Sequence, residues 1–292
     1  MYKLENLLCP ECHSELSLHN DLICINCKAV YNIENGIPIL LTKNFMANQF
    51  GMDYHEHYKI DNDFYDYFEE RICMATAHDE RRVREYIVSL IPNTAKNILD
   101  IGSGGAWAAM ELCKKGFEVC SFDITFHNIS KALTMVPDDN HSGVVGDALN
   151  PPFKNETFDC IIASEIIEHL VEPKEFVKNI IPLLKKDGVL IISTPYKEKI
   201  QYSICVHCNT PTPHNAHLHS FDENSLTAAF GEQRNNCQNY IFGNKALTIA
   251  RTHVLLQFLP LSIWKAADKL ANLLINKPAH IICKYININS QN

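Results

Sequence analysis

The chain has 292 residues, of which 46% are hydrophobic and 21% charged, so it can bury a substantial core and is not a disordered protein. Its 26 Lys and Arg residues against 34 Asp and Glu residues give a net charge of −8, which lacks the cationic excess of a general nucleic-acid binder. The sequence begins without an apolar leader, and its longest apolar run, residues 254–264, is too short to span a bilayer. Twelve cysteines without a secretory signal favour a reducing compartment, so we expect a cytoplasmic, soluble protein.

The first 42 residues are punctuated by cysteine. Cys9 and Cys12 form one C-x-x-C pair, and Cys24 and Cys27 form a second, with eleven residues between the two pairs. A C-x-x-C turn presents two sulfurs on one side of a tight loop, and two such turns complete a tetrahedral zinc site. Two separate redox or buried pairs are the alternative, which the repeated spacing disfavours. The sequence therefore predicts Zn²⁺ at these four cysteines.

Apolar periodicity divides the rest of the chain. Residues 79–90 show a helical pattern with Val83, Ile87, Leu90 and Ile91 on one face. From residue 97 onwards, short β-branched runs alternate with helical patterns, which is typical of βαβ units around a parallel sheet. We predict strands at 97–101, 118–122, 144–146, 160–163, 189–193, 238–242 and 279–286, and helices at 106–115, 173–185 and 222–230. Three parts follow: a zinc ribbon at 1–42, a helical lid or linker at 43–94, and an α/β domain at 95–292.

A glycine-rich turn follows the first strand of the α/β domain. Gly102 and Gly104 allow close approach of the backbone to a ligand, and N–H groups at the start of the next helix can hold an anion. A dinucleotide fingerprint needs a third glycine at position 107, where Trp107 stands, so an NAD site is disfavoured.

Acidic residues stand at the ends of the next two strands. Asp123 lies 19 residues beyond Gly104, and Asp147 follows Gly146. Each acid taken singly is more often a helix cap or a loop residue. The carboxyl ends of parallel strands meet at one edge of a sheet, where such folds bind ligands, so the two acids together indicate a ligand site.

The glycine turn resembles motif I of class I S-adenosylmethionine-dependent methyltransferases, D-x-G-x-G-x-G, with Asp100 first and Ala106 in place of the last glycine. The resemblance covers about residues 83–286. It implies a Rossmann-like seven-stranded methyltransferase sheet, mostly parallel with one antiparallel strand. It also implies S-adenosylmethionine as cofactor, with Asp123 on the ribose and Asp147 on the adenine amino group. The implied cofactor-binding residues are Asp100, Gly102, Ser103, Gly104, Asp123, Asp147, Ala148 and Ser164.

The N-terminal segment carries a second resemblance. Residues 4–41 resemble the zinc-ribbon domain of small methyltransferase-activating proteins and their bacterial relatives, which are usually structural or partner-binding. The resemblance implies that the ribbon can bind a protein partner. Its local charge is −3, from two lysines against five carboxylates, which argues against a nucleic-acid clamp.

Residues 150–153 read Asn-Pro-Pro-Phe, which imitates the N-P-P-[FY] motif of amide and adenine-amine methyltransferases. That motif belongs after the fourth strand of the sheet, whereas this tetrapeptide precedes it. We interpret residues 150–153 as the turn before the strand and assign them no catalytic role.

Glu165, Glu168 and His169 follow the fourth strand, at the position that faces the transferable methyl group in the family. The pattern Glu-x-x-Glu-His resembles that of ubiquinone-pathway O-methyltransferases and metal-dependent small-RNA 2′-O-methyltransferases. This resemblance implies metal-assisted deprotonation of an oxygen nucleophile, with His169 and Glu165 as catalytic residues. His219, in His-Ser-Phe-Asp, resembles the turn that supplies a further ligand, so Glu165, Glu168, His169 and His219 form a candidate site for Mg²⁺ or another divalent cation. Ordering of the loop is the simpler alternative for the Glu-His pair.

A third C-x-x-C pair, Cys205 and Cys208, lies after the fifth strand with several histidines behind it. It predicts either a second zinc site or a lid over the substrate, and the sequence leaves both open.

Methyl transfer from S-adenosylmethionine to a small molecule, at an oxygen, is the favoured function. An rRNA or tRNA methyltransferase is the first alternative, because some bacterial rRNA enzymes join a zinc knuckle to this fold. A non-catalytic methyltransferase-like scaffold that presents the ribbon to a partner is the second. Nucleic acid is the less favoured substrate because of the acidic charge balance.

Overall fold

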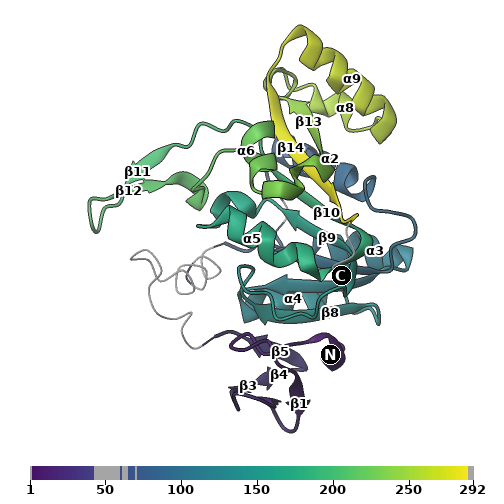
Figure 1. The fold of residues 1–292 in the computed structure, drawn as a ribbon. Helices are drawn as coiled ribbons and strands as arrows, with labels where there is room; N and C mark the ends of the chain where they lie inside the picture. Colours follow the sequence, from purple (N-terminus) through teal and green to yellow (C-terminus); the bar gives the residue numbers. More distant parts are fainter. Residues whose placement is uncertain (1, 43–59, 61–64, 70, 289–292) are drawn as a thin grey trace.

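The computed structural model describes residues 2–42, 60, 65–69 and 71–288. Part of the segment predicted as a lid or linker, residues 43–59, 61–64 and 70, lies outside them. The described chain forms a nine-stranded sheet with helices on both faces and a ribbon at one end (Figure 1). The strand order is β13-β14-β10-β9-β6-β7-β8-β5-β4. The strands of the α/β part are β6 (Asn97–Ile101), β7 (Glu118–Asp123), β8 (His141–Gly146), β9 (Phe158–Ser164), β10 (Leu184–Pro195), β13 (Cys237–Asn244) and β14 (Pro278–Ile286).

The strands from β8 to β10 pair in parallel, and β14 runs antiparallel to both β10 and β13. This is the mostly parallel methyltransferase sheet that the resemblance implied, and every predicted strand of that sheet is present. The structure lengthens the strands, most clearly at β8, which begins at His141 rather than at residue 144. The fold class is therefore confirmed.

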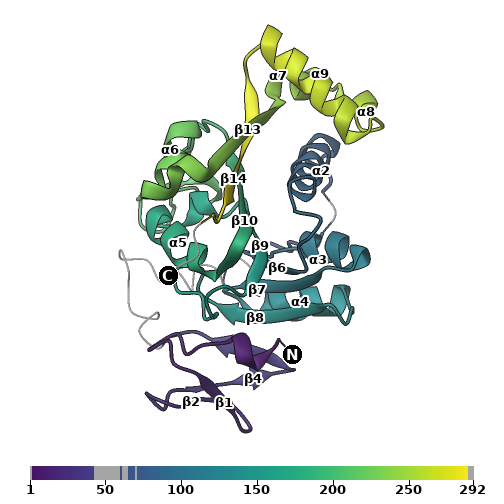
Figure 2. The same ribbon diagram turned by 45° about the vertical axis from the view of Figure 1, so that its right-hand side comes forward.

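Alternate residues of the central strands enter two separate cores, one on each face of the sheet. On β9, Ile161 and Ala163 face α5 (Pro173–Ile180) and α6 (Glu223–Ala228), while Cys160 and Ile162 face the other side. That other side is covered by α2 (Met74–Val88), α3 (Trp107–Leu112) and α4 (Phe126–Met135), as Figure 2 shows. Burial on both faces is the reason that these strands read as continuous apolar runs.

The helix predicted at 173–185 is the clearest error in the secondary structure. Helix α5 ends at Ile180, a short 3₁₀ turn covers Ile181–Leu183, and β10 begins at Leu184. Pro182 lacks an N–H donor and cannot continue the helical ladder. The cations and glycine at 185–188, interpreted as a helix end, instead form an irregular stretch of β10 where its register against β9 shifts.

The ribbon extends the large sheet. A three-stranded sheet contains β1 (Leu16–Leu18), β2 (Leu22–Cys24) and β3 (Val30–Tyr31), and the next hairpin contains β4 (Ile33–Glu34) and β5 (Ile37–Leu40). Strand β5 pairs in parallel with β8, with Ile39 opposite Val145 and Leu40 opposite Gly146. The edge of the α/β sheet is thereby covered by the ribbon, which removes an open row of backbone donors and acceptors.

The ribbon also docks on residues 150–153, the segment that imitated a catalytic motif. Leu7 forms an antiparallel bridge with Phe153, and the Leu8 N–H donates to the Pro152 carbonyl at 2.9 Å. The Phe153 ring lies 5.6 Å from the ring of Tyr2, edge to face. As predicted, residues 150–153 precede β9. Their role in the structure is to hold the ribbon.

A helical insertion separates β13 from β14 at the other end of the sheet. It contains α7 (Lys245–Ile249), α8 (His253–Leu256) and α9 (Leu261–Leu274), which the sequence analysis did not predict. Asp268 of α9 is buried and accepts hydrogen bonds from the backbone N–H groups of Gly243 and Asn244. The opposite face of α9 exposes Leu270, Leu273 and Leu274.

Candidate functional site

A cavity enclosing about 790 Å³, open to solvent, lies at the carboxyl ends of β6, β7, β8 and β9. The residues predicted to bind the cofactor or to act in catalysis that line it are Gly102, Gly104, Asp123, Asp147, Ala148, Glu165 and His169. They come from four different strand ends, which the parallel pairing of the sheet brings together. The parallel topology therefore places turns that are separate in the sequence next to one another in one site.

The glycine turn needs its glycines. Gly102 has a φ of +68°, and a Cβ there would lie 2.4 Å from Cγ2 of Ile166. Gly104 has a φ of +39°. Ala106, which replaces the third glycine of the motif, has a φ of +55° and is fully buried, so its methyl group is accommodated in a left-handed conformation.

Asp123 is held in place by its neighbours. Its Oδ1 accepts hydrogen bonds from the Thr125 N–H at 3.0 Å and the Thr125 hydroxyl at 3.1 Å. The Gly104 N–H points to Oδ2 at 3.4 Å, which links the glycine turn to the end of β7. Burial raises the pKa of Asp123. The fixed carboxylate faces the cavity, where it can accept hydrogen bonds from a ligand.

Asp147 ends β8 and also lines the cavity. Its Oδ1 accepts a hydrogen bond from the Leu149 N–H at 2.8 Å. This bond stabilises the turn that leads to the ribbon contact. Burial raises the pKa of Asp147 to about 6.

Asp100, Ser103 and Ser164 do not line the cavity. Asp100 is 1% exposed, and its Oδ2 has no hydrogen-bond partner among the described residues. Burial, with a smaller contribution from the charge of Asp123, raises the pKa of Asp100 to about 8. The Ser164 hydroxyl is 3.0 Å from that of Ser193. The assignment of these three residues to the cofactor therefore stays a prediction.

Several lining residues were not predicted. Asn128 of α4 reaches the cavity and its side-chain amide lies 3.4 Å from Oδ1 of Asp123. Tyr67 comes from the segment before α2, and a Cβ on Gly105 would lie 2.4 Å from its carbonyl oxygen. Lys131 forms an ion pair at 2.6 Å with Asp66, which anchors that segment to α4. No local pattern identifies Tyr67, because it reaches the site through a long-range contact.

Two carboxyl groups follow β9: Glu168 is buried, and Glu165 is partly exposed and lines the cavity. The Ser193 hydroxyl donates to Glu165 at 2.9 Å, and the Thr194 hydroxyl donates to Glu168 at 3.0 Å. Burial raises the pKa of Glu165 to about 7, and burial together with the charge of Glu165 raises that of Glu168 well above its usual range. Glu165 also has a φ of +55°, an uncommon conformation for a residue with a side chain.

The structure brings His217, rather than His219, to Glu168 and His169. One ligand atom from each of Glu168, His169 and His217 lies within 4.8 Å of the others. The predicted group of Glu165, Glu168, His169 and His219 does not converge in this way among the described residues. The reason is backbone pairing: the N–H groups of Leu218 and His219 both donate to the Glu168 carbonyl, and the His219 ring is 3.4 Å from the Val171 carbonyl.

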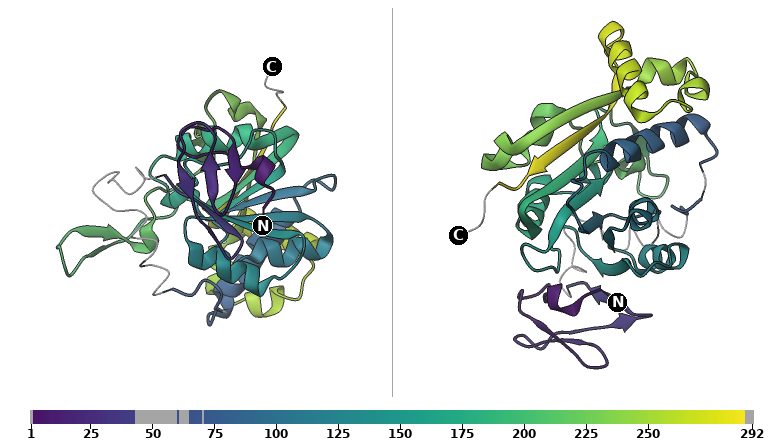
Figure 3. Two further views of the ribbon diagram at one scale, coloured as in Figure 1. Left: turned by 90° about the horizontal axis from the view of Figure 1, so that it is seen from below. Right: turned by 90° about the vertical axis from the view of Figure 1, so that its right-hand side faces the viewer.

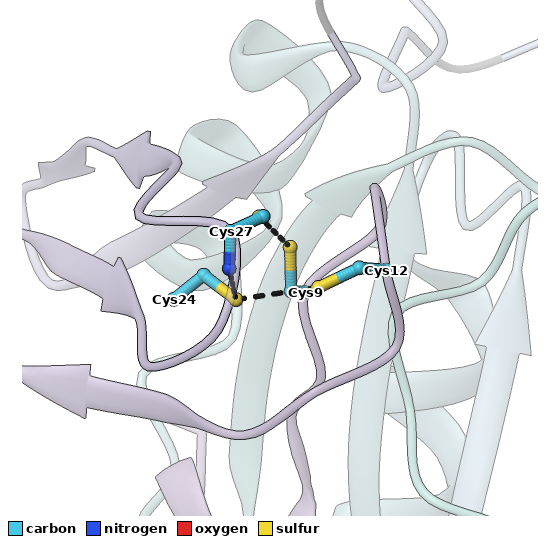
Figure 4. A group of neighbouring side chains, drawn as sticks. All are labelled: Cys9, Cys12, Cys24 and Cys27. Atoms are coloured by element: carbon cyan, nitrogen blue, oxygen red, sulfur yellow. Dashed lines mark hydrogen bonds between the residues drawn. The ribbon is translucent and has the colours of Figure 1, made fainter.

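The four cysteines of the ribbon converge as predicted. Figure 4 shows their side chains pointing toward one another from two loops. Their sulfurs lie within 4.8 Å of one another, with 3.6 Å between Cys9 and Cys27 and 3.4 Å between Cys12 and Cys24. Tetrahedral zinc with Zn–S bonds of about 2.3 Å needs sulfurs about 3.8 Å apart, so the donor set and its spacing fit this ion.

A doubly wound α/β sheet with a cavity at the carboxyl ends of its parallel strands defines a Rossmann-like ligand-binding protein. The family described as "Methyltransferase domain" matches residues 75–240, more than half of the chain. The chain belongs to this family.

One curated relative is the ubiquinone biosynthesis O-methyltransferase of Rickettsia akari, which is 32% identical over 108 residues. That match covers 37% of this chain and 43% of the relative, so the chain spans less than half the length of that enzyme.

Two solved structures share the fold at low identity. A protein from Pyrococcus horikoshii OT3 has a TM-score of 0.51 and 14% identity, and the match covers 80% of this chain and 98% of that one. An S-adenosylmethionine-dependent methyltransferase from Mesorhizobium loti has a TM-score of 0.50 and 13% identity, over 72% of this chain and 99% of that one. Among the described residues, helices long and apolar enough to cross a membrane are absent.

Proposed function

We propose that this protein transfers the methyl group of S-adenosylmethionine to an oxygen atom of a small molecule. One observation carries the proposal: the cavity has Gly102, Asp123 and Asp147 on its cofactor side, and Glu165 and His169 on the side that follows β9. Family membership and the likeness to an O-methyltransferase support the same chemistry.

The cofactor would lie across the carboxyl ends of the strands. Asp123 would accept hydrogen bonds from the ribose hydroxyls, and Asp147 with the adjacent Ala148 backbone would contact the adenine. Gly102 and Gly104 would allow the amino-acid part of the cofactor to approach the turn. Their φ values and the absence of space for a Cβ at Gly102 support this assignment.

The protein's part in the reaction is alignment and proton removal. The cofactor supplies an electrophilic methyl group, which an acceptor oxygen attacks as the sulfonium bond breaks. His169 would take the proton of the acceptor hydroxyl. Its ring lies edge to face against that of His217 at 4.7 Å, and His217 Nδ1 contacts Glu198 at 2.5 Å. The Glu198–His217 pair would hold the His169 ring in position.

A divalent cation at Glu168, His169 and His217 is the alternative to this role, because an imidazole bound to the ion no longer accepts the proton. Oε1 of Glu168 is buried without a hydrogen-bond partner among the described residues, as an open ligand position requires. Two imidazoles and one carboxylate suit Mn²⁺, Fe²⁺, Co²⁺ or Zn²⁺ better than Mg²⁺, which prefers oxygen ligands. Such an ion would lower the pKa of a bound hydroxyl.

The ribbon would hold a structural Zn²⁺ through Cys9, Cys12, Cys24 and Cys27. The spacing of the sulfurs supports the assignment. In this proposal residues 1–42 are a metal-stabilised module, and its outer surface remains available to a protein partner.

Calorimetric titration with S-adenosylmethionine tests the cofactor site. Asp123→Asn should weaken binding at least tenfold, because a charged acceptor for ribose hydroxyls contributes about 1.5–3 kcal/mol per bond. The control is Asp139→Asn, at an exposed position, which should bind like the parent protein. A parent protein that binds no cofactor would instead support the scaffold alternative.

Labelled-methyl transfer to a panel of catechols and other small hydroxylated molecules tests the reaction. His169→Gln should abolish turnover and leave cofactor affinity unchanged. Transfer to ribosomal or transfer RNA, with none to small hydroxylated molecules, would contradict the proposed acceptor class.

A further inference from the structure

The third cysteine loop has an unusual amount of internal order for a surface turn. It connects β11 (Tyr202–Ile204) to β12 (Pro211–Pro213), an antiparallel hairpin. The Cys205 N–H donates to the Thr210 carbonyl at 3.0 Å, and the Asn209 N–H donates to the Cys205 carbonyl at 2.9 Å. Asn209 has a φ of +55°. The two sulfurs therefore lie on a folded turn.

Both loops of the ribbon repeat this geometry. In each loop, the N–H of the first cysteine donates to the carbonyl of the residue five positions later. The N–H of the residue four positions later donates to the carbonyl of the first cysteine, and this residue has a positive φ. The bonds are Cys9 to Ser14 at 2.9 Å, His13 to Cys9 at 2.8 Å, Cys24 to Ala29 at 2.9 Å and Lys28 to Cys24 at 3.2 Å, with φ values of 54° at His13 and 62° at Lys28. The three C-x-x-C loops thus share the same two backbone hydrogen bonds and the same positive φ, and two of them converge in the ribbon.

The third loop offers only half of a zinc site. Cys205 is partly buried, Cys208 is exposed, and neither belongs to a group of three or more convergent metal-ligand side chains among the described residues. A tetrahedral Zn²⁺ ion needs two more ligands.

The hairpin that carries the loop projects from the body of the molecule (Figures 1 and 3). Tyr202 and Ile204 are each 60% exposed and Val206 is 99% exposed. Tyr202 and Ile204 are alternate residues on one face of β11, and Val206 lies in the turn that follows, so β11 and its loop expose an apolar stripe. A projecting tip with two thiols and an apolar stripe can meet an identical tip without collision of the two bodies.

We propose that the Cys205–Cys208 loop is a third zinc knuckle and that a second copy of this chain completes its site, tip to tip. Four thiols, two from each copy, lose their protons to solvent and bind one shared Zn²⁺ ion, with no change in oxidation state. The Tyr202, Ile204 and Val206 stripes of the two hairpins are buried against each other. This proposal is independent of methyl transfer.

Two measurements on the full-length protein, loaded with zinc and kept reduced, test the proposal. Metal analysis gives the zinc content per chain, and sedimentation gives the oligomeric state. The parent should be a dimer that binds about 0.5 zinc ion per chain more than Cys208→Ser, because one ion is shared by two chains. Cys208→Ser should be a monomer. Cys73→Ser, which removes another exposed cysteine, should match the parent in both measurements.

Three results would overturn the proposal. A monomeric parent that binds about one zinc ion per chain more than Cys208→Ser would place all ligands of the loop site in one chain. A zinc content that Cys208→Ser does not reduce would show that the loop binds no zinc. A dimer that survives zinc removal and dissociates on reduction would be a disulfide dimer. Val206→Glu provides a second variant: it keeps both thiols, and it should weaken the zinc-dependent dimer at least tenfold.

Discussion

The two ends of the large sheet carry additions that differ in where their apolar residues lie. Beyond β8, the ribbon continues the sheet through β5, and its Leu7, Leu22 and Leu40 belong to the same core as the central strands. Beside β13, helices α7–α9 pack Trp264 into the core on the opposite face of the sheet, whose described residues include none that line the cavity, and Asp268 adds polar contacts. An addition that shares the core of the cavity residues should be coupled to the site, whereas one that packs into the opposite core should not.

The largest expected effect is at the ribbon contact. Phe153 is 2% exposed and packs edge to face against the rings of Tyr2, Phe122 and Phe158. Phe153→Ala should lower the free energy of unfolding by about 3–5 kcal/mol, as expected for a large buried aromatic side chain. Because Phe122 lines the cavity, S-adenosylmethionine affinity should fall as well. Denaturant unfolding and calorimetry provide the two measurements.

The matched control for this variant lies in the insertion. Phe258 is 79% exposed, so Phe258→Ala should change stability by less than about 0.5 kcal/mol and leave cofactor affinity intact. Equal losses in the two variants would refute the difference between the two ends of the sheet.

Asp147, at the end of the strand that carries the ribbon, should make stability depend on pH. Its pKa of about 6 in the folded protein lies above the value of 3.8 expected when unfolded, so the folded state retains a proton that the unfolded chain releases. Its contribution to the free energy of unfolding is therefore present below about pH 4 and is lost as the pH rises to about 6, a change of at most about 3 kcal/mol. Chemical unfolding between pH 4 and 8 should show a flatter profile for Asp147→Asn. A pH profile of the free energy of unfolding that is the same in Asp147→Asn and in the parent would show that Asp147 does not cause the pH dependence.

Asp268→Ala tests the polar attachment of the insertion. The variant leaves the buried N–H groups of Gly243 and Asn244 without their acceptor, at a cost of about 2 kcal/mol in the free energy of unfolding. Cofactor affinity should stay within twofold of the parent, because Asp268 contacts none of the residues that line the cavity. A parallel loss of affinity would show that the insertion is coupled to the site.

The smallest effect belongs to the outer face of α9. Leu273 is 75% exposed, so Leu273→Glu should alter the free energy of unfolding by less than about 0.5 kcal/mol. A loss above 1 kcal/mol, measured by denaturant unfolding, would mean that this face is covered.

Local patterns in the sequence identified much of the fold and part of the site. The strands were predictable because residues buried on both faces leave continuous apolar runs, as in Cys160–Ala163 of β9. The convergence of the four ribbon cysteines was predictable because two turns of fixed spacing suffice to bring the sulfurs together. Gly102 and Asp123 line the cavity because motif spacing and parallel topology place strand ends together.

Features that depend on contacts between distant segments were not predictable. Sequence resemblance selected His219 as the partner of Glu168, whereas backbone pairing of residues 218 and 219 with the Glu168 carbonyl places His217 there. Tyr67 reaches the cavity through a contact that no periodicity records. The helix predicted at 173–185 ends early because Pro182 and the bulged start of β10 outweigh the helical pattern.

The sequence alone determined the paired-cysteine turns, the strands of the α/β sheet and the acids at the strand ends. These features arise from side-chain periodicity and short-range backbone geometry, which a single chain segment contains. Only the tertiary structure decided that β5 joins the edge of β8, that residues 150–153 hold the ribbon, and that α9 turns its leucines outward. In each case several surfaces of similar apolar character could have paired. Which of them pair depends on the shape and the hydrogen-bonding groups of both segments, and these are known only when both are folded.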